Sequence, residues 1–148
     1  MSAYDIRPAT ARDLQPASAL LTEAGLPIDG FADHLRNALV ATRGSHVVGV
    51  VELELYGEAA LLRSLVVAPA ERGTRLGERL TTGALALARA SGARDVYLLT
   101  QTAERFFPRF GFTAEDRARA PQALGHSEEF RTACPASAVM MHARLTKD

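Results

Sequence analysis

The hydrophobic pattern changes between two periods along the chain and predicts a mixed α/β domain. Alternating or continuous apolar runs predict strands near residues 4–8, 39–42, 46–56, 60–67, 95–100 and 137–145, with another strand starting at Phe112. Apolar residues at helical spacing predict helices near residues 10–25, 31–39, 76–91 and 103–110. The stretch 114–135 is polar and irregular. The order β-α-α-β-β-β-α-β-α-β-β is typical of a mixed fold and not of a uniform alternation.

Local signals set several of these boundaries. Thr10, three residues before Asp13, resembles a capping box and predicts the start of the first helix. The tripeptide at 43–45, Arg-Gly-Ser, separates two apolar runs and predicts a hairpin. Residues 61–67 are mostly apolar on both faces, so this strand should lie in the centre of the sheet.

The segment that follows the central strand predicts an anion site. Residues 72–77, Arg-Gly-Thr-Arg-Leu-Gly, connect the strand to an amphipathic helix. The first amides of a helix lack intrahelical partners, and the helix dipole places partial positive charge there. We therefore expect a phosphorylated cofactor. The G-x-G-x-x-G spacing of dinucleotide-binding folds is absent.

Composition narrows the class of protein. The 148 residues are 47% apolar, which favours one folded domain over residues 1–148 and argues against disorder. The net charge is zero, so nothing global indicates a nucleic-acid or membrane partner. The run from Arg63 to Arg94 holds six arginines and two acids; it forms either a solvated face or a basic collar around a polyphosphate.

Cysteine usage and the absence of targeting signals favour the cytoplasm. Cys134 is the single cysteine, which excludes an internal disulfide. No signal-peptide pattern opens the chain, and no apolar run approaches the ~18 residues of a membrane span. We expect no metal site, because no cluster of histidine and cysteine has zinc spacing.

Four segments together resemble the GNAT acyltransferases, which transfer an acetyl group from acetyl-CoA to an amine. They are Val66-Val67-Ala68-Pro69, the 72–77 turn, Tyr97-Leu98-Leu99 and Phe106–Phe112. The resemblance covers nearly the whole chain. It implies the GNAT fold, with a mixed, mostly antiparallel sheet, splayed central strands and flanking helices.

Three further segments resemble the branch of this family found in arsenic-resistance operons. They are 62–67 (Leu-Arg-Ser-Leu-Val-Val), 52–57 (Glu-Leu-Glu-Leu-Tyr-Gly) and 134–138 (Cys-Pro-Ala-Ser-Ala). This branch implies acetylation of a small, amino-acid-like amine, since a relative acts on toxins such as arsinothricin and phosphinothricin. Direct metalloid binding is not expected, because one thiol cannot form a multidentate site. Instead, Cys134 should pack at the start of the last strand.

The resemblance assigns a set of residues to the acetyl-CoA. The turn and helix start should cradle the pyrophosphate, and a strand bulge should free an amide near Leu65 or Val66 to polarise the thioester carbonyl. The expected cofactor-binding residues are Leu65, Val66, Val67, Arg72, Gly73, Thr74, Arg75, Leu76, Gly77, Glu78, Thr100 and Phe107.

Three of these positions depart from the family. Arg75 replaces a small residue, so its side chain either crowds the loop or swings outward onto a phosphate. Phe107 stands where many relatives have the tyrosine that protonates the leaving thiolate, and it has no donor. Thr100 replaces a common asparagine. The thiolate must therefore be protonated by water or another group.

Candidates for catalysis and acceptor binding lie on the neighbouring strands. Glu52 and Glu54 share one strand face with Tyr56; they form either the general base, with Glu54 preferred, or an ordinary polar face. Leu65 is the expected oxyanion donor through its amide. Arg63 either binds an acceptor carboxylate or pairs with Glu52 or Glu54. The expected substrate-binding residues are Arg63, Ser64 and His126.

The sequence thus predicts an acetyl-CoA-dependent N-acetyltransferase with a small-molecule acceptor, and leaves a homodimer open. Two alternatives remain. One is a non-catalytic acyl-CoA sensor, favoured by Phe107, by Thr100 and by Leu61 at the position of the glutamate that some relatives use as base. The other is a nucleotide-binding module that uses the same helix N-terminus.

Overall fold

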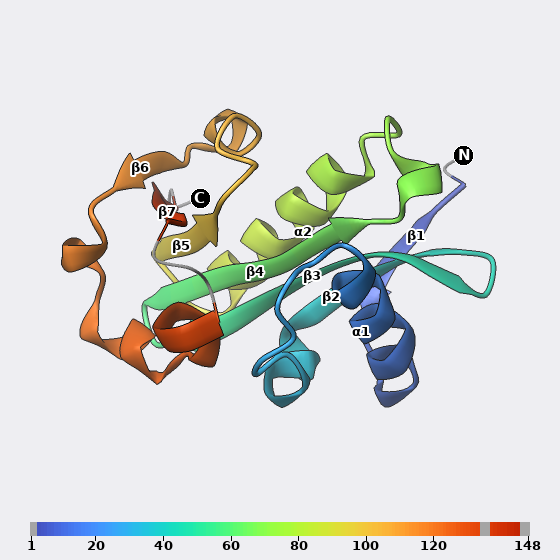
Figure 1. The fold of residues 1–148 in the computed structure, drawn as a ribbon, viewed down its shortest axis with the longest axis horizontal. Helices are drawn as coiled ribbons and strands as arrows, with labels where there is room; N and C mark the ends of the chain where they lie inside the picture. The colour runs from blue at the N-terminus through green and yellow to red at the C-terminus, as the bar shows by residue number, and fades with distance from the viewer. Residues whose placement is uncertain (1–2, 134–136, 146–148) are drawn as a thin grey trace.

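A computed structural model describes residues 3–133 and 137–145 (Figure 1). Within this part of the chain, one sheet has the strand order β1-β2-β3-β4-β5-β7-β6. All neighbouring strands are antiparallel except β4 and β5, which are parallel. The strands are β1 (Asp5–Pro8), β2 (Ala38–Arg43), β3 (His46–Tyr56), β4 (Ala59–Val67), β5 (Asp95–Thr100), β6 (Thr113–Glu115) and β7 (Val139–Arg144).

Two α-helices and several single turns complete the described chain. The helices are α1 (Leu14–Glu23) and α2 (Leu76–Ala90). The 3-10 turns are η1 (Ala11–Asp13), η2 (Ala32–Asn37), η3 (Pro69–Glu71), η4 (Phe107–Phe110), η5 (Arg117–Arg119) and η6 (Gln122–His126). A π-helical turn, η7, spans Glu129–Ala133.

The helices cover opposite faces of the sheet (Figure 1). The apolar face of α2, with Leu80 and Ala84, packs on a core that includes Leu53 and Leu62. On the other face, α1 contributes Ala17 and Leu21 to a second core around Val50 and Val66. Farther along this second face, Leu124 of η6 packs on Leu61 and Met140. The η6–η7 region therefore shares a face with α1, and polar side chains of β3 are enclosed beneath them.

The sheet opens between β4 and β5. These strands pair only from Ala59 with Asp95 to Leu61 with Tyr97, after which no further pairing is present. On its other side β4 contains a bulge, because Val50 pairs with Val66 whereas Glu52 pairs with Arg63. Ser64 and Leu65 thus lie opposite the single residue Val51, as in a β-bulge. Both expected features, the splay and the bulge, are present.

Several predicted boundaries are confirmed. The strands 46–56 and 95–100 have their expected ends, and the hairpin turn lies between Arg43 and His46. The capping box of Thr10 and Asp13 is formed at the start of η1. The continuous apolar strand, β4, lies centrally, with three strands on each side in the described sheet.

Two helix predictions are wrong. The segment 31–39 forms only the 3-10 turn η2, because Ala38 and Leu39 pair with Glu52 and Val51 and start β2. The segment 103–110 is helical only over Phe107–Phe110. Pro108 has no amide hydrogen to donate, so an α-helix from Ala103 cannot continue through it.

Candidate functional site

The splay between β4 and β5 leaves a cavity of about 150 Å³. Its walls are mainly apolar, and its only charged lining side chains within the described residues are Arg63 and Glu129. The full lining is Leu26, Pro27, Leu62, Arg63, Ser64, Leu65, Leu98, Leu99, Thr100, Thr102, Ala103, Phe107 and Glu129. We call this the cleft. The bulged residues Ser64 and Leu65 lie on its wall, where they can contact a chemical group held in the cleft.

A second hollow, of about 310 Å³, lies where the loop after β4 enters α2. The first α-helical bond here runs from the Arg79 amide to the Arg75 carbonyl, so the amides of Leu76, Gly77 and Glu78 precede it. The Phe106 ring forms part of the wall, and a Cβ built on Gly77 would lie 3.6 Å from it. This hollow is lined by Val67, Glu71, Arg72, Gly73, Arg75, Leu76, Gly77, Glu78 and Phe106.

The conformation of Arg75 explains why a small residue suits its position. Its φ of 64° lies in the left-handed region, which glycine adopts at no steric cost. The side chain is exposed, so it does not crowd the loop. Of the two alternatives for Arg75, the structure has the outward orientation of the side chain. The pairing of Arg75 with a phosphate stays a prediction.

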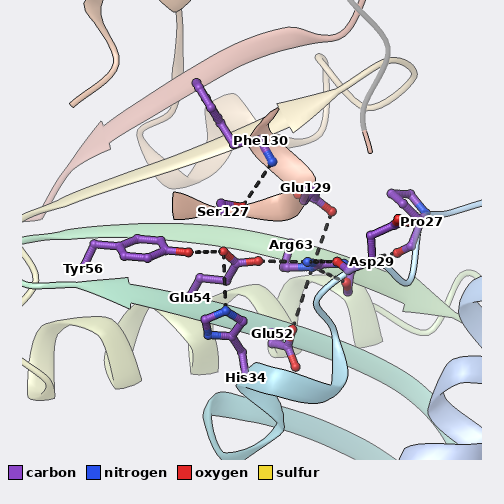
Figure 2. Close-up of polar contacts among 11 residues, drawn as sticks. Pro27, Asp29, His34, Glu52, Glu54, Tyr56, Arg63, Ser127, Glu129 and Phe130 are labelled. Carbon is purple, nitrogen blue, oxygen red and sulfur yellow. Dashed lines mark hydrogen bonds and ion pairs between the residues drawn. The ribbon is translucent and has the colours of Figure 1, made fainter. Parts of the chain in front are cut away.

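Arg63 lies in a buried polar cluster and is 2% exposed (Figure 2). Its Nη1 donates to Glu54 Oε2 at 2.8 Å and to the Asp29 carbonyl at 2.6 Å. Its Nη2 donates to the Pro27 carbonyl at 3.3 Å, and its Nε to Ser64 Oγ at 3.0 Å. The pair with Glu54, which the sequence left open, is thus formed. The arginines at 72, 75, 79, 89 and 94 are exposed, whereas Arg63 is buried. Arg63 therefore belongs neither to a solvated face nor to a basic collar, and the prediction for the run from 63 to 94 is wrong at this position.

Three carboxyl groups surround Arg63 and come from two parts of the chain (Figure 2). Glu52 and Glu54 come from one face of β3, as their alternation in the strand requires. Glu129 comes from η7, on the other side of the guanidinium. Its Oε1 lies 3.4 Å from Arg63 Nε, and Glu52 Oε1 lies 3.8 Å from the same nitrogen.

The three carboxyl groups have different acidities. Burial raises the pKa of Glu52 to about 9 against the opposing effect of Arg63, and neither Glu52 oxygen has a hydrogen-bond partner. Burial also acts to raise the pKa of Glu54, but hydrogen bonds from Tyr56 and Arg63 place it below its usual value. Burial raises the pKa of Glu129 to about 7, with Arg63 opposing the rise. Near neutral pH, Glu54 is charged, Glu52 is protonated and Glu129 titrates.

The other expected site residues fall into three groups. Ser64, Leu65, Thr100 and Phe107 line the cleft. Val67, Arg72, Gly73, Arg75, Leu76, Gly77 and Glu78 line the second hollow. Three line neither space: Thr74 donates to the Glu71 carbonyl at 2.6 Å, Val66 packs in the α1-side core, and His126 is exposed at the end of η6. Cys134 and the expected start of its strand lie outside the described residues.

Glu129 is the residue that sequence analysis missed. It lies in the polar stretch 114–135, where no hydrophobic period fixes the direction of a side chain. Its contact with Arg63 joins η7 to β4, which are 62 or more residues apart in sequence. No local signal reveals such a placement.

The bulge places Ser64 in the left-handed backbone region, with a φ of 61°. We expect Ser64→Val to lower the free energy of unfolding by about 2 kcal/mol, since a β-branched residue is strongly disfavoured in the left-handed region. Ser64→Gly is expected to stay within about 1 kcal/mol of the wild type, because relief of strain offsets the lost hydrogen bond. Urea denaturation of both variants measures the difference. Equal stabilities would contradict this backbone conformation.

No group of three or more histidine, cysteine, aspartate or glutamate side chains is arranged to hold a metal ion in the described part of the chain. Within residues 3–133 and 137–145, no helix has the length and apolar character needed to cross a membrane.

Comparisons with known proteins agree with this geometry. A family model described as an acetyltransferase (GNAT) domain matches residues 34–114. No curated protein matches the sequence significantly. Solved structures do match: N-acetylglutamate synthase from Neisseria gonorrhoeae, determined with coenzyme A and N-acetyl-glutamate, has a TM-score of 0.83 and 18% identity, covering 99% of this chain and 36% of its own.

Two smaller proteins match over nearly their whole length. Rv2747 from Mycobacterium tuberculosis, in complex with coenzyme A and a second ligand, has a TM-score of 0.79 and 18% identity, covering 96% of this chain and 99% of its own. PaiA N-acetyltransferase from Thermoplasma acidophilum, in complex with coenzyme A, has a TM-score of 0.72 and 18% identity, with coverage of 98% and 100%. The chain therefore spans about a third of the synthase and almost all of the other two. The predicted fold is confirmed.

Proposed function

The chain belongs to the GNAT acetyltransferase domain family, and on that basis we propose that it transfers the acetyl group of acetyl-CoA to the amine of a small molecule. The observation that carries the proposal is the cleft between β4 and β5, with its bulge at Ser64 and Leu65. The second hollow continues from the same strand into the first amides of α2. A thioester in the cleft and a pyrophosphate in the hollow would thus belong to one ligand.

In this proposal the hollow binds the pyrophosphate of coenzyme A. The amides of Leu76, Gly77 and Glu78 supply donors that the helix itself does not use. Gly73, with a φ of 83° and nothing within 4 Å of a built Cβ, keeps the approach open. Arg72 and Arg75 are exposed at its rim and would pair with the phosphate oxygens.

The cleft binds the acetyl thioester. The register leaves Ser64 and Leu65 without cross-strand partners, and we assign the Leu65 amide as the donor to the carbonyl oxygen. Removing such a donor costs about 10²–10³ in rate in other enzymes. Thr100 and Phe107 line the cleft on the β5 side and would contact the ligand there. Because Phe107 has no donor, the leaving thiolate takes its proton from water or from the attacking nitrogen.

For the acceptor we propose an amino-acid-like compound of the kind handled in arsenic resistance. The support is the sequence resemblance around 52–57 and 62–67, together with an arginine at the cleft wall. We assign Arg63 and Ser64, which line the cleft, to the acceptor carboxylate; His126 lines neither space, and its role stays a sequence prediction. Glu54 holds Arg63 in place, and, acting through water, it is the base that the sequence favours.

The organisation of the protein is also proposed. We infer that residues 1–148 form one acetyltransferase domain, since the sheet draws on residues 5–144. We propose that it acts in the cytoplasm, as a monomer or a homodimer, without a nucleic-acid or membrane partner. The second candidate function is an acyl-CoA sensor. It is favoured by Phe107, which is buried against Phe106 and Phe112 and leaves the cleft without the tyrosine hydroxyl common in relatives.

A ligand screen tests these functions. Acetyl-CoA at 100 times its Kd should stabilise the protein by about 2.7 kcal/mol and raise its Tm, while ATP should not. Thiol release should then follow the addition of amino-acid analogues from a panel. Stabilisation by acetyl-CoA without release on any amine would favour the sensor. Stabilisation by ATP alone would contradict both and favour the nucleotide module.

A further inference from the structure

Glu129 brings a carboxylate to the cleft that no other described element supplies. Its side chain is 6% exposed, and it lines the cleft beside Arg63. Glu52 and Glu54 are fully buried and do not line the cleft. Of the three carboxyl groups around Arg63, Glu129 is therefore the one that a ligand in the cleft can contact.

Glu129 is also held in a fixed position. Ser127, 1% exposed, accepts from the Phe130 amide through Oγ at 3.1 Å and from the Arg131 amide through its carbonyl at 3.0 Å. Arg117 donates to the Phe130 carbonyl at 3.3 Å and lies over its ring. These bonds fix the backbone before and after Glu129 in the sequence. Figure 2 shows Glu129 directed from this turn toward Arg63.

We propose that Glu129 is the general base that removes the proton from the acceptor ammonium, an inference that rests on the proposed acetyl transfer. Glu54 is less suited, because Tyr56 and Arg63 already occupy its two oxygens. Glu52 is less suited because it already holds a proton at neutral pH and cannot take a second one from the ammonium. His34 lies 3.7 Å from Glu54 and does not line the cleft.

The chemistry balances with these groups alone. The N–H bond of the ammonium breaks and an O–H bond forms on Glu129, which leaves a neutral amine. The amine nitrogen attacks the thioester carbon, and the oxyanion forms at the Leu65 amide. Collapse breaks the C–S bond, and the second nitrogen proton passes to the thiolate directly or through water. Glu129 returns its proton to solvent, so the products are the amide, the free thiol and one proton.

The surroundings of Glu129 set its working range. Burial raises its pKa to about 7; the Arg63 cation opposes the rise, while Glu54 and Asp29 add to it. Glu52 is also nearby but is neutral at this pH. A base with a pKa close to the operating pH combines a useful charged fraction with a useful affinity for the proton.

The test compares Glu129→Gln with Glu128→Gln, its exposed neighbour outside the cleft. With an amino-acid acceptor that is an ammonium ion at neutral pH, Glu129→Gln should lower kcat/KM by about 10²–10⁴-fold. The rise of wild-type kcat/KM through pH 7 should disappear in this variant, and Glu128→Gln should keep both. The Kd of coenzyme A, which carries no acetyl group into the cleft and whose pyrophosphate hollow does not include Glu129, should change by less than about twofold in either variant.

Hydroxylamine separates the loss of a base from the loss of structure. It is already unprotonated at neutral pH, so its acetylation should be nearly equal in wild type and Glu129→Gln. Carbon-13 NMR of labelled glutamate carboxyl groups should show a group titrating near pH 7 that is missing from the variant. An unchanged pH profile, or an equal loss with hydroxylamine, would overturn the role of Glu129 alone. A wild type that binds acetyl-CoA but releases no thiol with either nucleophile would overturn the acetyl transfer itself.

Discussion

Arg63→Met is expected to lower the free energy of unfolding by about 3–5 kcal/mol at neutral pH, the range found when one partner of a buried ion pair is removed. The substitution keeps most of the side-chain volume but removes the only arginine or lysine within 4 Å of the carboxyl oxygens of Glu52, Glu54 and Glu129, among the described residues. Glu54 would then stay buried with its charge unpaired. Urea denaturation at pH 7 measures the loss directly.

Two comparisons identify the cause. Arg72→Met removes an exposed arginine and should change stability by less than about 0.5 kcal/mol. The double variant Arg63→Met, Glu54→Gln should recover part of the loss, because it removes the unpaired charge as well. The penalty should also shrink as the pH falls and the carboxyl groups become protonated. A loss below about 1 kcal/mol for the single variant would mean that the cluster contributes little.

The parts of the fold that local patterns determine were predicted well from the sequence. β3 and β5 were recognised from alternating or continuous apolar runs, and turn residues bound them closely. The long helix α2 has an apolar face and a glycine beyond its end. The family pattern adds the splay and bulge of β4, which no periodicity reveals.

The parts that depend on distant contacts were predicted poorly. Ala38 and Leu39 have helical spacing, but pairing with β3 places them in a strand. Strand alternation correctly places Glu52 and Glu54 on one face, yet it cannot say how they differ. That difference comes from Tyr56, Arg63 and the segments that enclose the face. Glu129 reaches the cleft only because the irregular stretch folds back over β4.

Glu52→Gln is expected to flatten the pH dependence of stability. The pKa of Glu52 is raised from 4.5 to about 9 in the folded protein. Between these values the folded chain keeps a proton that the unfolded chain has lost, so the unfolded state binds fewer protons and stability falls as the pH rises. One such proton corresponds to about 1.4 kcal/mol per pH unit. From pH 6 to pH 8, the wild type should therefore lose about 2–3 kcal/mol more than Glu52→Gln.

The control is Glu104→Gln, which changes an exposed carboxyl group and should keep the wild-type slope. Urea denaturation at pH 6, 7 and 8 gives the slopes of all three proteins. Glu129 titrates in the same direction up to about pH 7, so its share of the slope should end near that pH, while the share of Glu52 should continue toward pH 9. Parallel curves for wild type and Glu52→Gln would show that Glu52 is ionised in the folded protein. In that case its attraction to Arg63, 3.8 Å away, outweighs the cost of burial.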